Sequence, residues 1–173
     1  MLIRAACLLA ALAIAGQARA ADPALVSLGL GATDLLNHQT RAAGDLRLEY
    51  RSDLSLLPIF EQFLTVRPWV GFETTSRQAV WGGAGILADI PLGRHFVLAP
   101  SFGVGVYGQG NGKDLGSPLE FRSAFEAGYV FDNQSRLVAS FSHTSNAGFA
   151  KHNPGTEALV VSYQIPIAWL LSP

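Results

Sequence analysis

Apolar and polar residues alternate along most of the chain, which is the pattern of β-strands whose two faces meet different surroundings. In the clearest run, at 44–52, every second residue is charged and the residues between are mostly Leu or Tyr. Comparable alternation predicts strands at about 25–33, 44–52, 63–74, 78–90, 95–107 and 119–131. Two further runs, at 137–145 and 157–167, bring the number of predicted strands to eight.

The segments between these runs have the composition of turns and loops. Pro58 interrupts the alternation at 53–62, which predicts a turn with a short helical piece. The glycine-rich run 108–118 is a predicted loop, and 91–94 and 132–135 are predicted tight turns. Polar residues at 37–39 indicate a loop after the first strand.

Eight strands of about ten residues, each with one apolar and one polar face, match a small transmembrane β-barrel. A soluble barrel of the lipocalin type has the same period with its faces reversed, so periodicity does not separate the two. The charged face carries both signs, which could pair inside a narrow lumen, and the opposite face is rich in aromatic residues. These features favour an all-β fold, an eight-stranded antiparallel transmembrane β-barrel.

The first twenty residues indicate export. They contain Arg4, an apolar run from Ala5 to Ala15 and a small-x-small ending, which predicts a cleaved signal peptide at 1–20 and a barrel domain at 21–173. The chain's one cysteine lies in that segment, so disulfides are not expected in the barrel. After residue 21 no apolar run reaches about 18 residues, so no membrane-spanning helix is expected. The predicted location is the outer membrane.

Charge excludes one class of partner. Without residues 1–20, 10 of the 12 basic residues remain against 13 acidic ones, and no basic patch suggests nucleic-acid binding. An even-stranded outer-membrane barrel has short periplasmic turns and longer outer loops. The connections near 34–43, 75–77, 108–118 and 147–155 are therefore predicted to be extracellular.

Three residue types of hydrolytic chemistry meet near one of these outer loops. His143 and Ser145 share the apolar face of the seventh predicted strand, and Glu157 begins the same face of the eighth. A histidine can take the proton of a serine hydroxyl, and a carboxylate can orient that histidine. Asn146, Asn153 and the amides of Ala147 and Gly148 are candidate oxyanion donors. The GxSxG motif of soluble hydrolases is absent.

Several other interpretations fit the same residues. The cluster could be polar residues at the membrane interface without catalytic use. A metal site of His143, His152 and Glu157 lacks a ligand-spacing signature. Phe121, Trp69 and Tyr163 are most simply girdle or lipid-facing residues, although aromatic residues beside the cluster could also contact acyl chains.

The segment FSHTSNAG at 141–148, followed by Asn153, Glu157 and YQIPI at 163–167, resembles the lipid A 3-O-deacylase (PagL) family of outer-membrane proteins. The resemblance is strong from about 119 to 167 and loose before it. It implies an eight-stranded outer-membrane barrel with a lipid-facing site. It also implies the family's catalytic triad of His143, Ser145 and Glu157, with Asn146, Asn153 and Phe121 at further motif positions.

The resemblance implies hydrolysis of the ester-linked acyl chain at position 3 of lipid A, with no metal or organic cofactor. The implied partners are lipid A, or lipopolysaccharide, and outer-membrane lipid, and the sequence leaves open whether the chain forms a homodimer. Two rival functions remain at this point. One is a non-catalytic structural or adhesive barrel, and the other is a phospholipase acting on glycerophospholipids.

Overall fold

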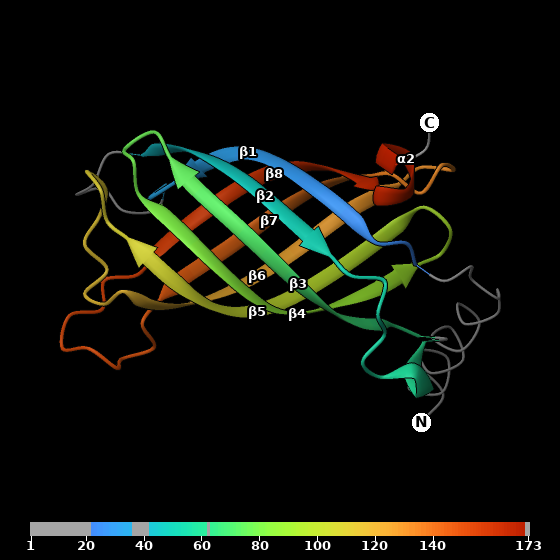
Figure 1. Cartoon of the computed structure of the whole chain (residues 1–173), viewed down its shortest axis with the longest axis horizontal. Coiled ribbons are helices and arrows are strands. Elements are labelled where there is room, and N and C mark those ends of the chain that lie inside the picture. Colours follow the sequence, from blue (N-terminus) through green and yellow to red (C-terminus); the bar gives the residue numbers. More distant parts are fainter. Residues whose placement is uncertain (1–21, 36–41, 62, 172–173) are drawn as a thin grey trace, which may run out of the picture.

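The alternating runs form eight strands that pair in chain order in this computed structural model, which describes residues 22–35, 42–61 and 63–171. The strands are β1 (Leu25–Thr33), β2 (Ala43–Arg51), β3 (Thr65–Thr75), β4 (Val80–Leu92), β5 (Phe96–Gly108), β6 (Leu119–Val130), β7 (Arg136–Ser145) and β8 (Thr156–Pro166). Antiparallel pairing of β1 with β8 closes the barrel (Figure 1). The predicted eight-stranded antiparallel barrel is confirmed, with small differences at the strand ends.

Within 22–35, 42–61 and 63–171, two short helices lie outside the barrel wall. η1 (Pro58–Phe60) lies in the segment where a turn with a helical piece was expected. α2 (Ile167–Leu171) begins where the last strand was expected to continue, because Pro166 has no N–H with which to extend the ladder. Neither is long and apolar enough to cross a membrane, and the described residues contain no helix that is. The predicted signal peptide at 1–20 and the polar loop residues 37–39 lie outside the described residues.

Apolar side chains point outward and charged side chains point inward. Leu30 and Val106 are 67% and 66% exposed on the outer face, whereas Arg67 and Glu120 are fully buried in the lumen. A lipocalin-type barrel would show the reverse arrangement. The soluble alternative is therefore wrong, and the outer face is a lipid-facing surface.

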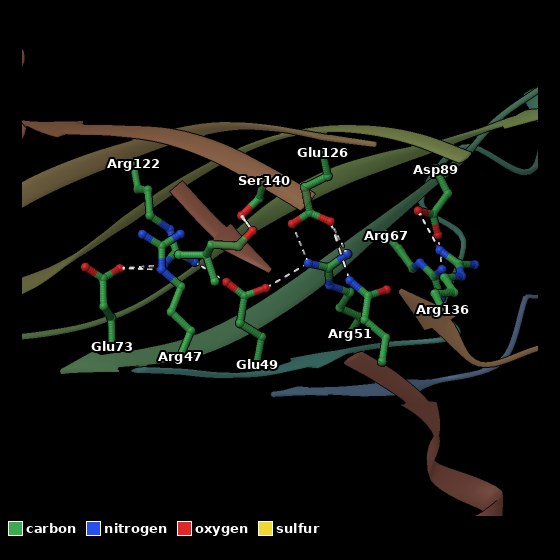
Figure 2. A network of polar contacts seen from close by, with 12 residues as sticks. Arg47, Glu49, Arg51, Arg67, Glu73, Asp89, Arg122, Glu126, Arg136 and Ser140 are labelled. Atoms are coloured by element: carbon green, nitrogen blue, oxygen red, sulfur yellow. Dashed lines mark hydrogen bonds and ion pairs between the residues drawn. The ribbon is translucent and has the colours of Figure 1, made fainter. Parts of the chain in front are cut away.

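Opposite charges pair across the lumen, as the mixed signs of the inner face predicted (Figure 2). Arg51 on β2 donates to both carboxylate oxygens of Glu126 on β6, at 2.8 and 2.6 Å, and to Glu49 at 2.9 Å. Arg122 on β6 also contacts Glu49, and it reaches Glu73 on β3 at 3.1 Å. These ion pairs connect opposite sides of the barrel and compensate charges that burial would otherwise make costly.

Trp69 points into the lumen, so its expected position on the lipid-facing surface is wrong. It has the parity of Arg67 and Glu73, is 2% exposed, and packs 6.0 Å from Trp81 between ring centroids. Arg122 lies over both indole rings, at 4.7 and 4.4 Å from the centroids. Glycines make room for the rings, because a Cβ at Gly103 or Gly105 would come within 2.5 Å of an indole atom.

The two ends of the barrel differ in their connections. The start of β1, the end of β8 and the connections 52–64, 93–95 and 131–135 lie at one end. The connections 34–42, 76–79, 109–118 and 146–155 lie at the other end, beside the predicted site. In outer-membrane barrels the end that holds both termini faces the periplasm. The candidate site therefore lies toward the outer leaflet.

Removing one partner of the central ion pair should destabilise the barrel. Glu126→Ala leaves the Arg51 guanidinium buried without its bidentate partner, and we expect a loss of about 3 kcal/mol in the free energy of unfolding. Asp132→Ala removes an acidic charge from an exposed position in the β6–β7 turn and should change it by less than about 0.5 kcal/mol. Urea midpoints of the two variants in phospholipid vesicles measure the difference, and equal midpoints would contradict the role of this pair.

Candidate functional site

The candidate site lies on the outer face where β6, β7 and β8 approach the long loops. Strand register pairs His143 on β7 with Glu157 on β8. The same register pairs Ser145 on β7 with Phe121 on β6. Because these residues occupy alternate positions on neighbouring strands, the barrel brings all four side chains to one patch of its lipid-facing surface.

The imidazole of His143 contacts the carboxylate of Glu157. The distance from Nδ1 to Oε1 is 3.1 Å, and the two side chains are 47% and 24% exposed. A carboxylate accepts the proton of Nδ1 and so favours the tautomer in which Nε2 is the free acceptor. The pair thus has the arrangement of an oriented general base.

Ser145 lies beside this pair without touching it. It is half-buried and shares the outer face with His143, about 6.7 Å away between Cα atoms for two residues of a strand. No hydrogen bond joins its hydroxyl to the imidazole in the structure. In enzymes without bound substrate, such contacts are often long and tighten only when substrate binds.

Ser123 is a second hydroxyl beside the imidazole, and sequence reasoning missed it. It is exposed on β6 and is the register partner of His143 on the side opposite Glu157. Directly opposed residues have Cβ atoms about 5 Å apart, closer than residues two apart on one strand. Only the strand pairing reveals this neighbour, because Ser123 lies twenty residues before His143 in the sequence.

Asn146 fastens the loop that follows Ser145. Its side chain is fully buried, and Nδ2 donates to the carbonyl oxygens of Leu115 and His152, both at 2.8 Å. Its Oδ1 accepts the N–H of Gly148 at 3.1 Å. Asn146 therefore holds the 146–155 loop against the 109–118 loop, and its side-chain polar atoms already have partners.

Two other donors beside Ser145 have no hydrogen-bond partner among the residues that the structure describes. Asn153 uses its Oδ1 to accept the N–H of Asn146 at 3.0 Å, which leaves its Nδ2 group available. The N–H of Ala147 is likewise unused, in a turn where Ala147 and Gly148 have φ angles of 54° and 81°. Of the predicted oxyanion donors, these two are the ones with free N–H groups.

Gly155 lies against the imidazole, a contact that sequence reasoning did not identify. It is buried with a φ of 59°, and a Cβ at this position would come 2.6 Å from Cε1 of His143 and 3.1 Å from Nε2. Any side chain at 155 would therefore displace the ring. The glycine two residues before Glu157 is the only signal of this constraint in the sequence.

A row of aromatic rings leads away from Ser145 along the outer face. Phe121 stacks on Phe102 with centroids 6.0 Å apart and contacts Phe149 at 5.7 Å. Phe149 is 79% exposed and belongs to the loop after Ser145. The sequence singled out Phe121, and the structure adds its two neighbours.

The residues of the alternative metal site do not assemble. His152 contributes its backbone carbonyl to Asn146. In the described part of the chain, no three His, Cys, Asp or Glu side chains form a group that could hold a metal ion.

Comparisons with known proteins agree with this geometry. A family model described as lipid A 3-O-deacylase (PagL) matches residues 68–166. The crystal structure of the outer-membrane enzyme PagL is similar, with 25% sequence identity, a TM-score of 0.61, and coverage of 82% of this chain and 99% of that one. A de novo designed transmembrane β-barrel shares the fold at 9% identity and a TM-score of 0.56, covering 86% of this chain and all of the design. Among curated proteins, none matches the sequence.

Loss of the Asn146 side chain should loosen the 146–155 loop. Asn146→Ala leaves the carbonyls of Leu115 and His152 without their donor, at a local cost of about 1–3 kcal/mol. Trypsin should then cleave after the exposed Lys151 at least about five-fold faster, as followed by mass spectrometry.

The control is Asn133→Ala, which removes a comparable turn-forming amide at the other end of the barrel. It should leave cleavage after Lys151 unchanged. If Asn146→Ala also cleaves at the wild-type rate, Asn146 does not fasten the loop.

Proposed function

Because the chain belongs to the lipid A 3-O-deacylase (PagL) family, we propose that it hydrolyses the 3-O-linked acyl ester of lipid A in the outer membrane. The observation that carries the proposal is the contact between His143 and Glu157 on the lipid-facing surface, beside Ser145. A general base and its orienting carboxylate at this position can act only on a substrate that lies in the membrane.

In the proposed mechanism, the Ser145 hydroxyl attacks the carbonyl carbon of the ester while Nε2 of His143 takes its proton. Glu157 holds Nδ1 and stabilises the imidazolium that forms. His143 then protonates the sugar oxygen as it leaves, which gives an acyl-enzyme. Water, deprotonated by the same nitrogen, releases the fatty acid and restores Ser145. The mechanism requires neither a metal nor an organic cofactor.

The negative oxygen of the tetrahedral intermediate needs hydrogen-bond donors. Asn153 Nδ2 and the Ala147 N–H belong to the loop that joins the two strands of the site, and we propose them as these donors. Asn146 supports this arrangement indirectly, because its side chain fixes the loop that carries both donors. We assign it a positioning role in place of direct contact with the oxyanion.

The aromatic row offers a surface for the substrate's acyl chain. Phe102, Phe121 and Phe149 are continuous with the lipid-facing wall and end beside Ser145. An ester whose acyl chain lies along these rings reaches the hydroxyl without leaving the membrane. The site lies toward the outer leaflet of the outer membrane, which is the leaflet that contains lipid A. This placement supports the choice of substrate.

Ser145→Ala should abolish deacylation. Loss of a triad nucleophile typically costs about 10⁴-fold or more in kcat, whereas Ser123→Ala should keep most of the activity. Mass spectrometry of lipid A from cells expressing each variant should show one hydroxyacyl chain missing with wild type and Ser123→Ala only. The reverse result would make Ser123 the nucleophile, and unchanged lipid A with folded wild type would refute the activity.

The same variants separate the rival functions. Purified wild-type protein that cleaves glycerophospholipid esters but leaves lipid A intact would be a phospholipase. Identical lipid profiles for wild type and His143→Ala, on both substrates, would indicate a non-catalytic barrel.

Gly155→Ala should lower kcat with little change in KM, because the new methyl group displaces the imidazole while the acyl-contact surface is untouched. A misplacement of about 1 Å costs roughly 10²-fold. Gly93→Ala is the matched control, with a φ of 69° and no atom within 4 Å of its Cβ position. The kcat and KM of the two variants are measured on purified lipid A. An equal loss of kcat in both would point to backbone strain and not to the contact with His143.

A further inference from the structure

The connection between β2 and β3 is unusual for the end of the barrel at which it lies. It runs over 52–64, whereas the other two connections at this end, 93–95 and 131–135, are tight turns. Periplasmic turns of outer-membrane barrels are normally short. η1 lies within this connection, at the same end as α2 and opposite the candidate site (Figure 1).

Apolar side chains of this connection are exposed. Ile59 is 77% exposed, and η1 has no buried residue. The exposed apolar members are Leu54, Leu56, Leu57, Ile59, Phe60 and Phe63. By sequence the only charged residues of the segment are Asp53 and Glu61. On a surface in water, an apolar cluster of this size would indicate a site that contacts a membrane or another protein.

The backbone of the connection is ordered by its own hydrogen bonds. Leu56 donates to the carbonyl of Val66 at 2.7 Å, which extends the β2–β3 hairpin beyond the barrel. Phe63 and Leu64 both donate to the carbonyl of Phe60, at 2.8 and 2.9 Å. The apolar side chains are thus held outward on an extension of the lipid-facing wall.

Neighbouring elements at this end have the character of a membrane interface. At the ends of β5 and β6, Tyr129 packs 5.5 Å from Phe96 and 5.1 Å from Phe131 between ring centroids, as in the aromatic girdles of membrane barrels. α2 exposes Trp169 and two leucines. On the β2–β3 side of the barrel, Phe60 and Phe63 supply the aromatic side chains.

We propose that the 52–64 connection inserts its apolar side chains into the periplasmic leaflet, among the acyl chains and glycerol groups of glycerophospholipids. Lipid fits better than a protein partner because the segment is continuous with the lipid-facing wall. The two acidic charges exclude attachment by attraction to anionic headgroups, so burial of apolar surface drives the contact. This proposal concerns the end of the barrel opposite the catalytic site and does not depend on the proposed function.

A spin label on Ile59 tests the proposal. In a Cys7→Ser background no other cysteine remains, so Ile59→Cys takes a single nitroxide label. Asp132→Cys, in the polar β6–β7 turn at the same end, is the control. The protein is reconstituted into phosphatidylcholine vesicles, and collision with oxygen is compared with collision with a water-soluble nickel chelate. Oxygen should dominate at 59 and the nickel chelate at 132.

Nickel collisions at 59 equal to those at 132 would place the connection in water and overturn the proposal. Shielding from both reagents would mean that protein covers it, and this outcome also overturns the proposal. Leu57→Cys repeats the measurement if the first variant folds poorly, which gel migration with and without heating reveals. Neither labelling experiment measures lipid A deacylation, so its result is independent of the proposed function.

Discussion

Closure of the sheet is the constraint on which the rest of this structure depends. A strand inside a bilayer has no water for its N–H and C=O groups, so each must pair with a neighbouring strand. β1 meets β8 along its whole length, from Leu25 opposite Pro166 to Thr33 opposite Ala158. Once the ring is closed, period-two alternation leaves only two destinations for a side chain, the lumen or the lipid. The ion pairs lie in the lumen, and the candidate site lies on the lipid-facing surface.

The site gains its precision from this same closure. His143 and Glu157 are cross-strand partners, so their separation is set by the hydrogen-bond ladder and not by a flexible loop. Asn146 and Gly155 determine where the loop passes over the imidazole and the serine. The barrel wall thus carries His143 and Glu157, and the loop held by Asn146 carries the donors proposed for the oxyanion.

Alternation along the sequence was enough to predict the strands and the division of each strand into two faces, because both follow from a local period. The proximity of His143 to Glu157 was predicted from their places at the facing ends of two consecutive antiparallel strands. Ser123 and Gly155 could not be predicted, since they reach the imidazole through strand register and loop path, which are non-local. Trp69 was misplaced because its aromatic character was given more weight than its parity with Arg67. Asn146 was predicted as an oxyanion donor, and the sequence could not reveal that its side chain bonds the carbonyl of Leu115, in a loop about thirty residues earlier.

The indole rings of Trp69 and Trp81, covered by the guanidinium of Arg122, also limit the free space inside the barrel. Together with the ion pairs they fill the interior, and the cavity at its loop end, lined by Asp34 and Tyr107 among others, has a volume of about 20 Å³. That is room for about one water molecule. At this level the described part of the lumen is filled by side chains and holds no wide aqueous channel. With the lumen filled, the function proposed for the outer face would meet its substrate in the plane of the membrane, at a rate governed by lateral diffusion and the surface density of lipid.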